Sequence, residues 1–553
     1  MPVSFVRQLG AESGVQLNPL RDNSEIPSTD NSDQVFGIIM RATRGRIDKP
    51  FKVDRGTVYT KLGKGEGMRV NALNEAWVQV VEALNNGAYE AVVQRLVPES
   101  ARIQYAVLTR VKDEGEEATT YHWVWTVMNE LPTTPFVLAV KHLGCFNDGI
   151  RLNFHAEEVK SNGASVANSE ITLRLLDKDD NKLYEFTASL KADAKDDYGQ
   201  SYYLPDVVQA QTDEVEVTVG VTGDNAAIQP TDAGYGYLST GLQSWAESGT
   251  LVCFEEGGTA YTTQIYQKAR EALQYCPYDF AYLSAGGTQD PALLAQLALL
   301  AFDTNKQLRF DVPGNLGVEA AVAFVEQLNM GASKTAHLMQ AFWHPVKSDD
   351  PTGINPRGFF GTATLNIAYA CGRNAVRNTK GFAPKNYPIA GREWPIARTR
   401  MEQVVQLRSQ DKNALARAKI NPVIYETYTG GGRFVFFDSL TCALVETSLK
   451  KLIAVADMST SIDDAVTRAA KDYLQLPMKA AIDKMNKFLV RLFEGAEASD
   501  WIVPAADPMM EGMAFKFDVR ANEARPYDTI DVRYWLRYDG TNRATFVTQT
   551  ITR

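Results

Sequence analysis

The sequence has few residues of the kinds that build metal sites, disulfides or catalytic centres. Its 553 residues include five cysteines and five histidines. The cysteines are far apart and form no Cys-x-x-Cys pair, so we expect buried, reduced thiols; they are Cys145, Cys253, Cys276, Cys371 and Cys442. The histidines form neither His-x-x-x-His nor His-Glu-x-x-His, which gives a metal site no support; they are His122, His142, His155, His337 and His344.

Long apolar runs are also missing. No stretch approaches the roughly 18–20 apolar residues of a membrane span, and the start, "MPVSFVRQLGAESG", lacks the basic-then-apolar pattern of a signal peptide. We therefore expect a soluble protein that is made in a cytoplasm. A hydrophobic content of 45% supports real cores, and the length predicts about three or four domains.

Catalytic motifs are equally scarce. There is no Gly-x-Ser-x-Gly and no convincing Cys/His pairing. His344 in "AFWHPV" fits either a catalytic base or the end of a strand. Pairs of Asp and Glu that meet only in the fold stay open at this point. The residues themselves therefore offer no catalytic, cofactor or metal motif.

A glycine-rich stretch, "YTKLGKGEGMRV", precedes a helical pattern at residues 59–70. Such turns often hold phosphates, but "GKGEGM" fits neither the P-loop nor the dinucleotide-binding pattern. Glu66 would also place a negative charge where a phosphate should lie. We interpret the stretch as a turn.

Charge is unevenly distributed around a net value of −10. Residues 157–232 hold sixteen acidic against six basic residues, whereas residues 373–419 hold eleven basic against three acidic ones. The basic stretch lacks the interleaved aromatics of a single-strand binder and any helix-turn-helix or zinc pattern. We therefore expect an acidic protein partner rather than nucleic acid.

Alternation of strands and helices predicts a largely parallel sheet. "VFGIIMRA" is a continuous apolar strand, "AWVQVVEALNNG" an amphipathic helix and "YEAVVQRLV" a returning strand. The same alternation of helices and strands resumes near Tyr261. Helices are expected at "YTTQIYQKAREALQYC", "DPALLAQLALLAFDTN" and "GVEAAVAFVEQLN". Strands are expected at "DFAYLSAG", "KQLRFDVPG" and "TAHLMQAFWHPVK". An all-β insertion, read from alternating residues such as "EITLRLLDKDDNKLYEFTASL", splits this domain.

The C-terminal third is predicted to contain both helices and strands. A long helix is expected at "SIDDAVTRAAKDYLQLPMKAAIDKMNKFLVRLFEGA", broken at Pro477. Two β runs follow, "DTIDVRYWLRY" and "RATFVTQTITR", separated by an Asp-Gly turn. They indicate an arm or an edge hairpin.

The order of these pieces resembles the contractile tail sheath proteins of bacteriophages and related injection machines. The stretches that carry the resemblance are "QVFGIIMRATRGRIDKPFKVDRGTVYTKLG", "AWVQVVEALNNGAYEAVVQRLV", "LAVKHLGCFNDGIRLNF", "MQAFWHPVKSDDPTG", "NTKGFAPKNYPI", "NALARAKINPVIY" and "ETSLKKLIAVADMSTSI". They cover roughly residues 35–155 and 260–500. Lys450 and Lys451 stand where the family usually has arginines, "FFDSLT" replaces a common Trp-Gly-x-Arg-Thr stretch, and the usual Pro-Gly-Val-Tyr start is missing.

The resemblance implies an α/β fold: a split α/β sheet domain with an all-β insertion, a mixed α/β C-terminal domain and extended terminal arms. The expected divisions are an N-terminal arm (1–33), the α/β domain in two halves (34–149 and 251–347), the insertion (150–250), the C-terminal domain (348–520) and a β arm (521–553).

The implied function is a structural subunit that polymerises as stacked rings around an inner tail tube and contracts to drive the tube through an envelope. The resemblance thus implies a protein that is not an enzyme, with no catalytic residue, no cofactor and no metal. Implied partners are further copies of the chain, the tube protein, and the baseplate and tail terminator proteins, with no nucleic acid and no membrane insertion. The implied location is the contractile tail of a virion, assembled in the bacterial host cytoplasm. A bacteriocin-like or secretion-type system is the alternative, and a doubly wound nucleotide-binding enzyme a more remote one.

Two sets of residues are candidates for assembly. The tube-facing candidates lie on one predicted helix: Lys479, Lys484, Lys487 and Arg491. The candidate inter-subunit arm strand is Phe546, Val547, Thr548, Gln549, Thr550 and Ile551, which would add to a neighbour's sheet because a chain end leaves its edge uncovered. Ordinary solvated charge and a hairpin that closes its own sheet are the respective alternatives.

Overall fold

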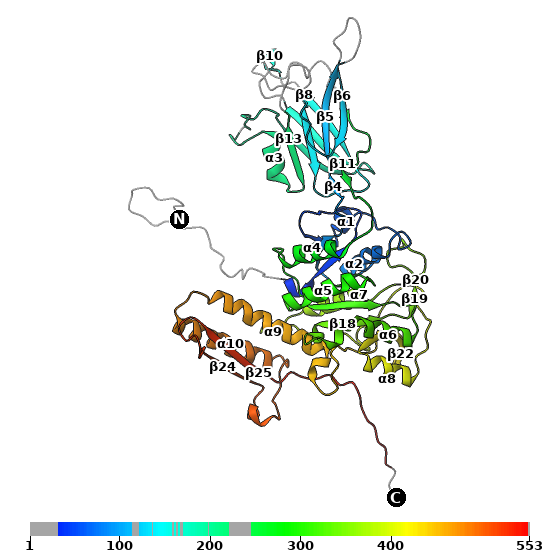
Figure 1. The fold of residues 1–553 in the computed structure, drawn as a ribbon, viewed down its shortest axis with the longest axis vertical. Coiled ribbons are helices and arrows are strands. Elements are labelled where there is room, and N and C mark those ends of the chain that lie inside the picture. Colours follow the sequence, from blue (N-terminus) through cyan, green and yellow to red (C-terminus); the bar gives the residue numbers. More distant parts are fainter. Residues whose placement is uncertain are drawn as a thin grey trace, which may run out of the picture.

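The computed structural model describes residues 31–112, 121–134, 136–157, 160–161, 164–165, 170–196, 198–220 and 245–550. Three parts follow one another along the long axis of the molecule (Figure 1). A β-rich part lies at one end, a large helix–sheet–helix part in the middle, and a small helical and hairpin part at the other end. The expected N-terminal arm falls almost wholly outside the described residues.

The middle part is built on an eight-stranded sheet of order β2-β3-β1-β16-β17-β18-β22-β23. Its strands are β1 (Val35–Met40), β2 (Phe51–Asp54), β3 (Glu90–Arg95), β16 (Tyr282–Ser284), β17 (Gln307–Val312), β18 (Met339–Trp343), β22 (Ile420–Tyr428) and β23 (Gly431–Phe436). The six strands from β3 to β22 are parallel, and an antiparallel strand closes each end. The predicted parallel α/β sheet is confirmed.

Helices cover both faces of this sheet, which explains the uninterrupted apolar sequence of β1. Phe36 and Ile38 point to the face covered by α2 (Glu75–Asn85) and α7 (Ala363–Asn374). Val35 and Ile39 point to the opposite face. That face is covered by α4 (Thr263–Gln274), α5 (Pro291–Thr304), α6 (Val318–Leu328) and α8 (Ser409–Arg417).

The β-rich part is a sandwich of two four-stranded sheets, β12-β11-β8-β14 and β13-β7-β5-β6, that share one core with helix α3 (Leu204–Gln211). Its strands are β5 (Tyr105–Lys112), β6 (Tyr121–Met128), β7 (Leu138–His142), β8 (Ile150–Glu157), β11 (Glu170–Asp177), β12 (Lys182–Ala188), β13 (Val215–Val219) and β14 (Ala246–Glu247). The short strands β4 (Arg102–Ile103) and β15 (Phe254–Glu255) pair where the chain leaves and rejoins the middle part.

Two of the expected domain boundaries need correction. The insertion begins near residue 102 rather than 150, because β5 to β7 pair with each other and with β13. The sheet domain extends beyond residue 347, because β22 pairs with β18. The sequence pattern shows that a segment is a strand, but pairing over such distances is decided by the packed cores.

The remaining part consists of α9 (Ile453–Asp472), α10 (Met478–Glu497) and a hairpin of β24 (Phe515–Ala521) with β25 (Ile530–Leu536). The break at Pro477 is confirmed, since Pro477 is the N-cap residue of α10. Helix α9 begins at Ile453, eight residues before the expected start. No helix within the described ranges is long and apolar enough to cross a membrane.

Candidate functional site

The hairpin of β24 and β25 is a two-stranded sheet whose inner face packs on α10. Phe515, Phe517 and Tyr534 surround Phe493 of α10 with ring centroids 5.4–5.9 Å apart. Within the described chain neither strand pairs with a third named strand. Residues 501–503 pair with residues 537–539, just beyond the end of β25. The expected hairpin between "DTIDVRYWLRY" and "RATFVTQTITR" is therefore wrong. The first of these runs contains β25, which pairs with the upstream strand β24. Both edges leave backbone groups available to another strand.

The C-terminal segment that follows has no partner strand. Residues 540–550 adopt no helix or strand and make no backbone–backbone hydrogen bond to other described residues. Phe546 is 95% exposed and Val547 is 88% exposed. One contact fixes the segment at its root, where the Arg543 guanidinium pairs with both oxygens of Asp438. Ile551 lies outside the described residues.

Helix α10 carries the four cationic candidates on its outer side. Its buried face is Ala481, Met485, Leu489, Phe493 and Ala496, whereas Lys479, Lys484, Lys487 and Arg491 are all exposed. No ion pair is found for these four within the described chain. Lys484, Lys487 and Arg491 follow i, i+3, i+7 and therefore share one stripe. The structure places them together on one helix, and Lys479 on its first turn.

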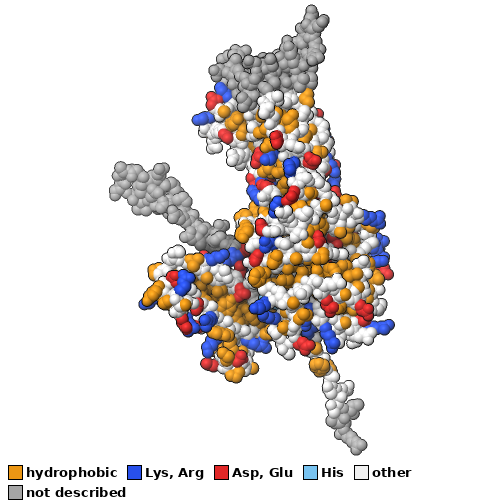
Figure 2. All heavy atoms as spheres, in the orientation of Figure 1, with side chains coloured by type: hydrophobic (Ala, Val, Ile, Leu, Met, Phe, Trp, Pro, Cys, Tyr) orange, Lys and Arg blue, Asp and Glu red, His pale blue; other side chains and the backbone are white. Residues whose placement is uncertain are grey.

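The basic stretch 373–419 does not form a basic surface, which corrects the expectation drawn from its charge. Six of its eleven cations are paired with acids elsewhere in the chain: Arg373–Asp457, Arg377–Asp33, Lys385–Asp33, Arg398–Glu82, Arg400–Asp349 and Lys412–Glu426. Several pairs are buried, and on the visible face basic and acidic side chains are interspersed (Figure 2). A charge count along the sequence misses such pairs because their acids are distant in sequence.

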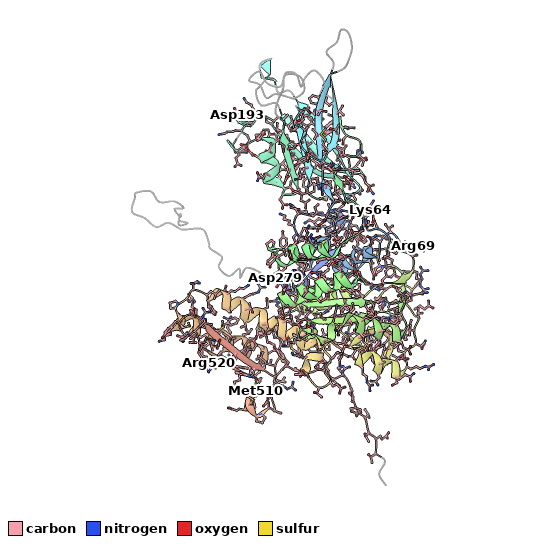
Figure 3. The ribbon with its side chains drawn as sticks, viewed as in Figure 1. Lys64, Arg69, Asp193, Asp279, Met510 and Arg520 are labelled. Carbon is pink, nitrogen blue, oxygen red and sulfur yellow. The ribbon has the colours of Figure 1, made fainter. Side chains whose placement is uncertain are left out.

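A second set of ion pairs joins the β-rich part to the sheet domain. Arg44 pairs with Asp148 at 2.9 Å, Arg46 with Asp213 at 2.9 Å, and Lys64 with Asp179 at 2.9 Å. Figure 3 shows Lys64 at this junction. Backbone bonds reinforce it, including Gly45 N to Gly144 O at 2.6 Å. The "RATRGRIDK" stretch of the sheet domain thus supplies cations to an acidic insertion.

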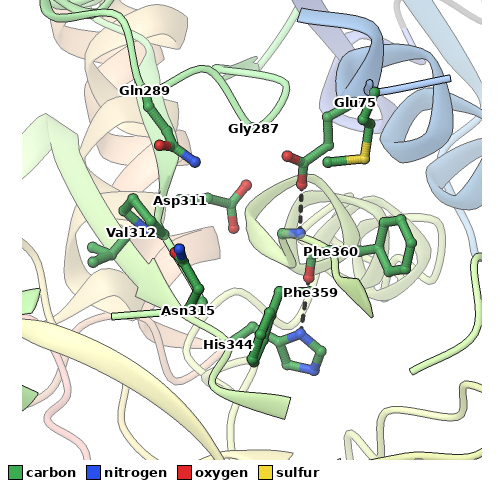
Figure 4. Close-up of a pocket in the computed structure, with 13 residues that line it drawn as sticks. Glu75, Gly287, Gln289, Asp311, Val312, Asn315, His344, Phe359 and Phe360 are labelled. Carbon is green, nitrogen blue, oxygen red and sulfur yellow. Dashed lines mark hydrogen bonds between the residues drawn. The ribbon is translucent and has the colours of Figure 1, made fainter. Parts of the chain in front are cut away.

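One pocket lies where an enzyme with this topology would bind its ligand, at the carboxyl ends of parallel strands. Its volume is about 250 Å³, and it is lined by residues after β16, β17 and β18 (Figure 4). Glu75 and Asp311 both accept hydrogen bonds from the Gln79 amide, at 3.1 and 3.0 Å. Asp311 also accepts the backbone N–H of Thr362 and Ala363 at the start of α7.

The chemistry of this pocket is acidic. Burial, with Asp311 nearby, raises the pKa of Glu75 to about 7. His344 is buried and its Nδ1 lies 2.8 Å from Phe360 O; burial and the charge of Arg398 hold its pKa well below 6.5. None of the thirteen lining residues is Lys or Arg. Phosphate would therefore meet carboxylates and no cation. His344 directly follows strand β18, which agrees with the interpretation that it marks the end of a strand.

The backbone of the glycine-rich stretch is packed against other side chains and is not available to hold a phosphate. A Cβ on Gly65 would lie 2.4 Å from the Trp77 ring, so the backbone is packed against that side chain. The Trp77 indole N–H donates to Gly63 O at 3.1 Å, and Glu66 pairs with the buried Arg41. The sequence "GKGEGM" at residues 63–68 forms no helix or strand, as predicted, whereas Tyr59–Leu62 belong to the short helix α1 (Val58–Leu62).

The described residues contain no group of three or more His, Cys, Asp and Glu that could hold a metal ion. The five cysteines are free, and all but Cys276 are buried. Sequence reasoning missed the polar cluster around Asp33, Lys385 and Asp457, in which distant segments meet at the base of α9. A signal existed in "SDQVF", where an acidic residue directly precedes a buried strand.

No family model and no curated protein sequence matches this chain. Solved structures similar to it include a sheath tail protein from Desulfitobacterium hafniense, with 14% identity and a TM-score of 0.47 over 96% of this chain and 100% of that chain. A sheath tail protein from Listeria innocua has 10% identity and a TM-score of 0.45, over 90% and 94% of the two chains. The sheath complex of an extracellular contractile injection system, PVC, in its contracted state has 10% identity and a TM-score of 0.40, over 52% and 74%. The structures that this chain is similar to are thus tail sheaths and the sheath of a contractile injection system.

Proposed function

We propose that this protein is the sheath subunit of a contractile tail: it polymerises into a helical sheath around an inner tube and contracts to drive the tube through a host envelope. The observation that carries the proposal is that, among the described residues, one subunit holds both a C-terminal segment without backbone partners and a hairpin with open edges. Residues 540–550 leave the body unpaired, and the β24–β25 hairpin keeps open edges. One subunit's segment can complete another subunit's hairpin.

Strand exchange of this kind suits an assembly that must move without falling apart. The bonds between subunits are then backbone hydrogen bonds at the chain ends, and the bodies between them are free to change their packing. The work of contraction comes from the difference in contact free energy between two packings, so the proposal assigns no catalytic step to the chain. The acidic pocket beside Glu75 and Asp311 is a structural feature in this proposal.

Helix α10 is the proposed tube-facing surface. Its stripe of Lys484, Lys487 and Arg491 is exposed and has no acidic partner in the described part of the chain. Exposed pairs contribute about 0–1 kcal/mol each, which lets a tube template assembly and still be released. The further partners in this proposal are the baseplate and tail terminator proteins. The location is a virion tail assembled in the host cytoplasm, or the tail of a bacteriocin-like or secretion-type particle.

The direct test is negative-stain microscopy of the purified protein, which should show striated tubes. Removing residues 545–553 should leave near-native circular dichroism and abolish the tubes, because residues 545–550 make no backbone hydrogen bond to the rest of the described chain. A destabilised or insoluble truncated protein would instead indicate a strand that closes its own domain. Tubes of normal appearance would contradict both interpretations.

Proline substitutions sharpen this test. Successive N–H groups of a strand point to opposite edges, so either Val547→Pro or Thr548→Pro must remove a donor that the acceptor strand needs. Val547→Ala and Thr548→Ala are the matched controls and should assemble normally. All four variants should fold, since both residues are exposed. Normal tubes from both proline variants would rule out strand addition at this segment.

A further inference from the structure

Asp33 lies at the root of the N-terminal segment, in the short helix Asn31–Gln34 just before β1. Its carboxylate accepts hydrogen bonds from Lys385 Nζ at 2.7 Å and from Arg377 Nη2 at 3.0 Å. Its backbone oxygen accepts a third from Asn374 Nδ2 at 3.0 Å. Burial opposes ionisation, but Lys385 and Arg377 offset it and lower the pKa of Asp33. The residue is therefore an ionised anchor held from three sides.

Lys385 extends this anchor to helix α9. Its side chain is buried, and the same ammonium that binds Asp33 donates to Ser461 Oγ at 2.6 Å. Ser461 Oγ in turn donates to the backbone oxygen of Asp457 at 2.8 Å. The Asp457 carboxylate accepts Arg373 Nη2 at 2.8 Å and Gln307 Nε2 at 2.7 Å. One continuous polar network thus joins the arm root, α7, β17 and α9.

Helix α9 continues from this network into the C-terminal part. Its twenty residues span about 30 Å. Its first half is buried: Ile453 belongs to a core of the sheet domain and Asp457 bonds to that domain. Met458, Ile462 and Val466 pack in one cluster with Met485 and Leu489 of α10. The helix that carries the cationic stripe is attached to the rest of the molecule through α9 and, just beyond its C-terminal end, through residues 378–386, where Trp501 Nε1 donates to Ala383 O at 2.8 Å (Figure 1).

We propose that Asp33 and Lys385 act as a mechanical clamp that couples the N-terminal segment to α9, so that a load on that segment shifts α9 and with it α10. This inference rests on the sheath proposal for its purpose, because a neighbour that holds the segment would then influence tube contact. The coupling itself is a property of the single subunit. Asp33 and Ser461 do not hydrogen-bond to each other, and Lys385 is what they share.

The test is amide hydrogen exchange on the isolated subunit, which needs no sheath. Asp33→Asn removes the charge with little change in shape and should raise exchange by roughly tenfold to a hundredfold, the effect of losing a charged hydrogen bond. The rise should reach both residues 31–34 and the first half of α9, 453–462. Asp349→Asn is the matched control, because it removes an ion pair with the exposed Arg400 far from the clamp. Faster exchange confined to residues 31–34, or no change in either segment, would overturn the proposal.

A double-mutant cycle tests the route of the coupling. Asp33→Asn, Ser461→Ala and their combination should give non-additive changes in the exchange of residues 453–462, since both act through Lys385. Additive changes would show that the two contacts are independent and would refute the clamp. Sheath assembly of the unmodified protein is scored separately by microscopy. Coupling without tubes would leave the clamp standing and reject the sheath proposal, and tubes without coupling would do the reverse.

Discussion

At the scale of single residues, the molecule buries many charged groups, and their partners differ sharply. Asp457 is paired with Arg373 at 2.8 Å, and Glu82 with Arg398 at 2.6 Å. Glu75 instead shares its surroundings with Asp311, and its hydrogen bonds come from neutral groups. A buried carboxyl without a cation is costly when it ionises.

Glu75 should therefore make stability depend on pH. Its pKa is about 7 in the folded state against 4.5 for the ordinary group. The contribution of protonated Glu75 to the free energy of unfolding is therefore fully present below pH 4.5 and is lost as the pH rises through 7. The loss amounts to at most about 3 kcal/mol. Glu75→Gln should remove this dependence and melt higher than the parent at pH 8, with little difference at pH 5. Calorimetric scans across this range measure it, and a parallel fall of both proteins would contradict the assignment.

At the scale of elements, helices with a clear apolar periodicity could be predicted from the sequence. The sheet to which each strand belongs could not. Helices α2, α4, α5 and α6 follow from their apolar periodicity, and Pro477 ends one helix before the next because it cannot continue it. Strands β5 to β7 were assigned to the wrong domain because pairing partners lie far away in sequence. The hairpin of β24 and β25 was missed for a different reason: β25 has apolar runs on both sides in sequence, and the pattern favoured the downstream run as its partner.

The stripe on α10 allows a prediction at this scale. Reversing Lys484 and Lys487 to Glu should leave the melting temperature nearly unchanged, since exposed substitutions cost about 0.5 kcal/mol or less, and should stop assembly on inner tubes. Lys471→Glu, an exposed cation on α9, is the control. Electron microscopy of sheaths grown on purified tubes gives the readout. Sheaths of normal length in the double variant would exclude this helix as the tube contact.

At the scale of the whole molecule, the β-rich part is a separate body attached by a narrow junction. It has its own core. Its junction with the sheet domain includes residues around 96–104, 143–149 and 248–256, together with the ion pairs of Arg44, Arg46 and Lys64 described above. Figure 1 shows it projecting from the sheet domain. Its acidic surplus therefore lies away from the hairpin and the C-terminal segment, which is what a peripheral domain requires.

Deleting this body should leave polymerisation intact if the cut follows the structure. Replacing residues 104–253 with an Asn-Gly turn joins Ile103 to Phe254, which are already paired in β4 and β15. Deleting 150–250 instead removes half of a shared core and should give an insoluble protein. Circular dichroism and negative-stain microscopy compare the two. A folded 104–253 deletion that forms no tubes would place the insertion in the lattice.

The contact between Arg543 and Asp438 decides which body carries the C-terminal segment. Asp438 follows β23 of the sheet domain, so the segment is tethered there although it comes after the hairpin in sequence. Its pivot is Arg543 and not Asp539, which shortens the free length by four residues, or about 13 Å. If the C-terminal part tilts on α9, the segment stays behind with the sheet domain. In the proposed sheath, the tether and the hairpin of one subunit would therefore change their separation while the strands exchanged with neighbours stay paired.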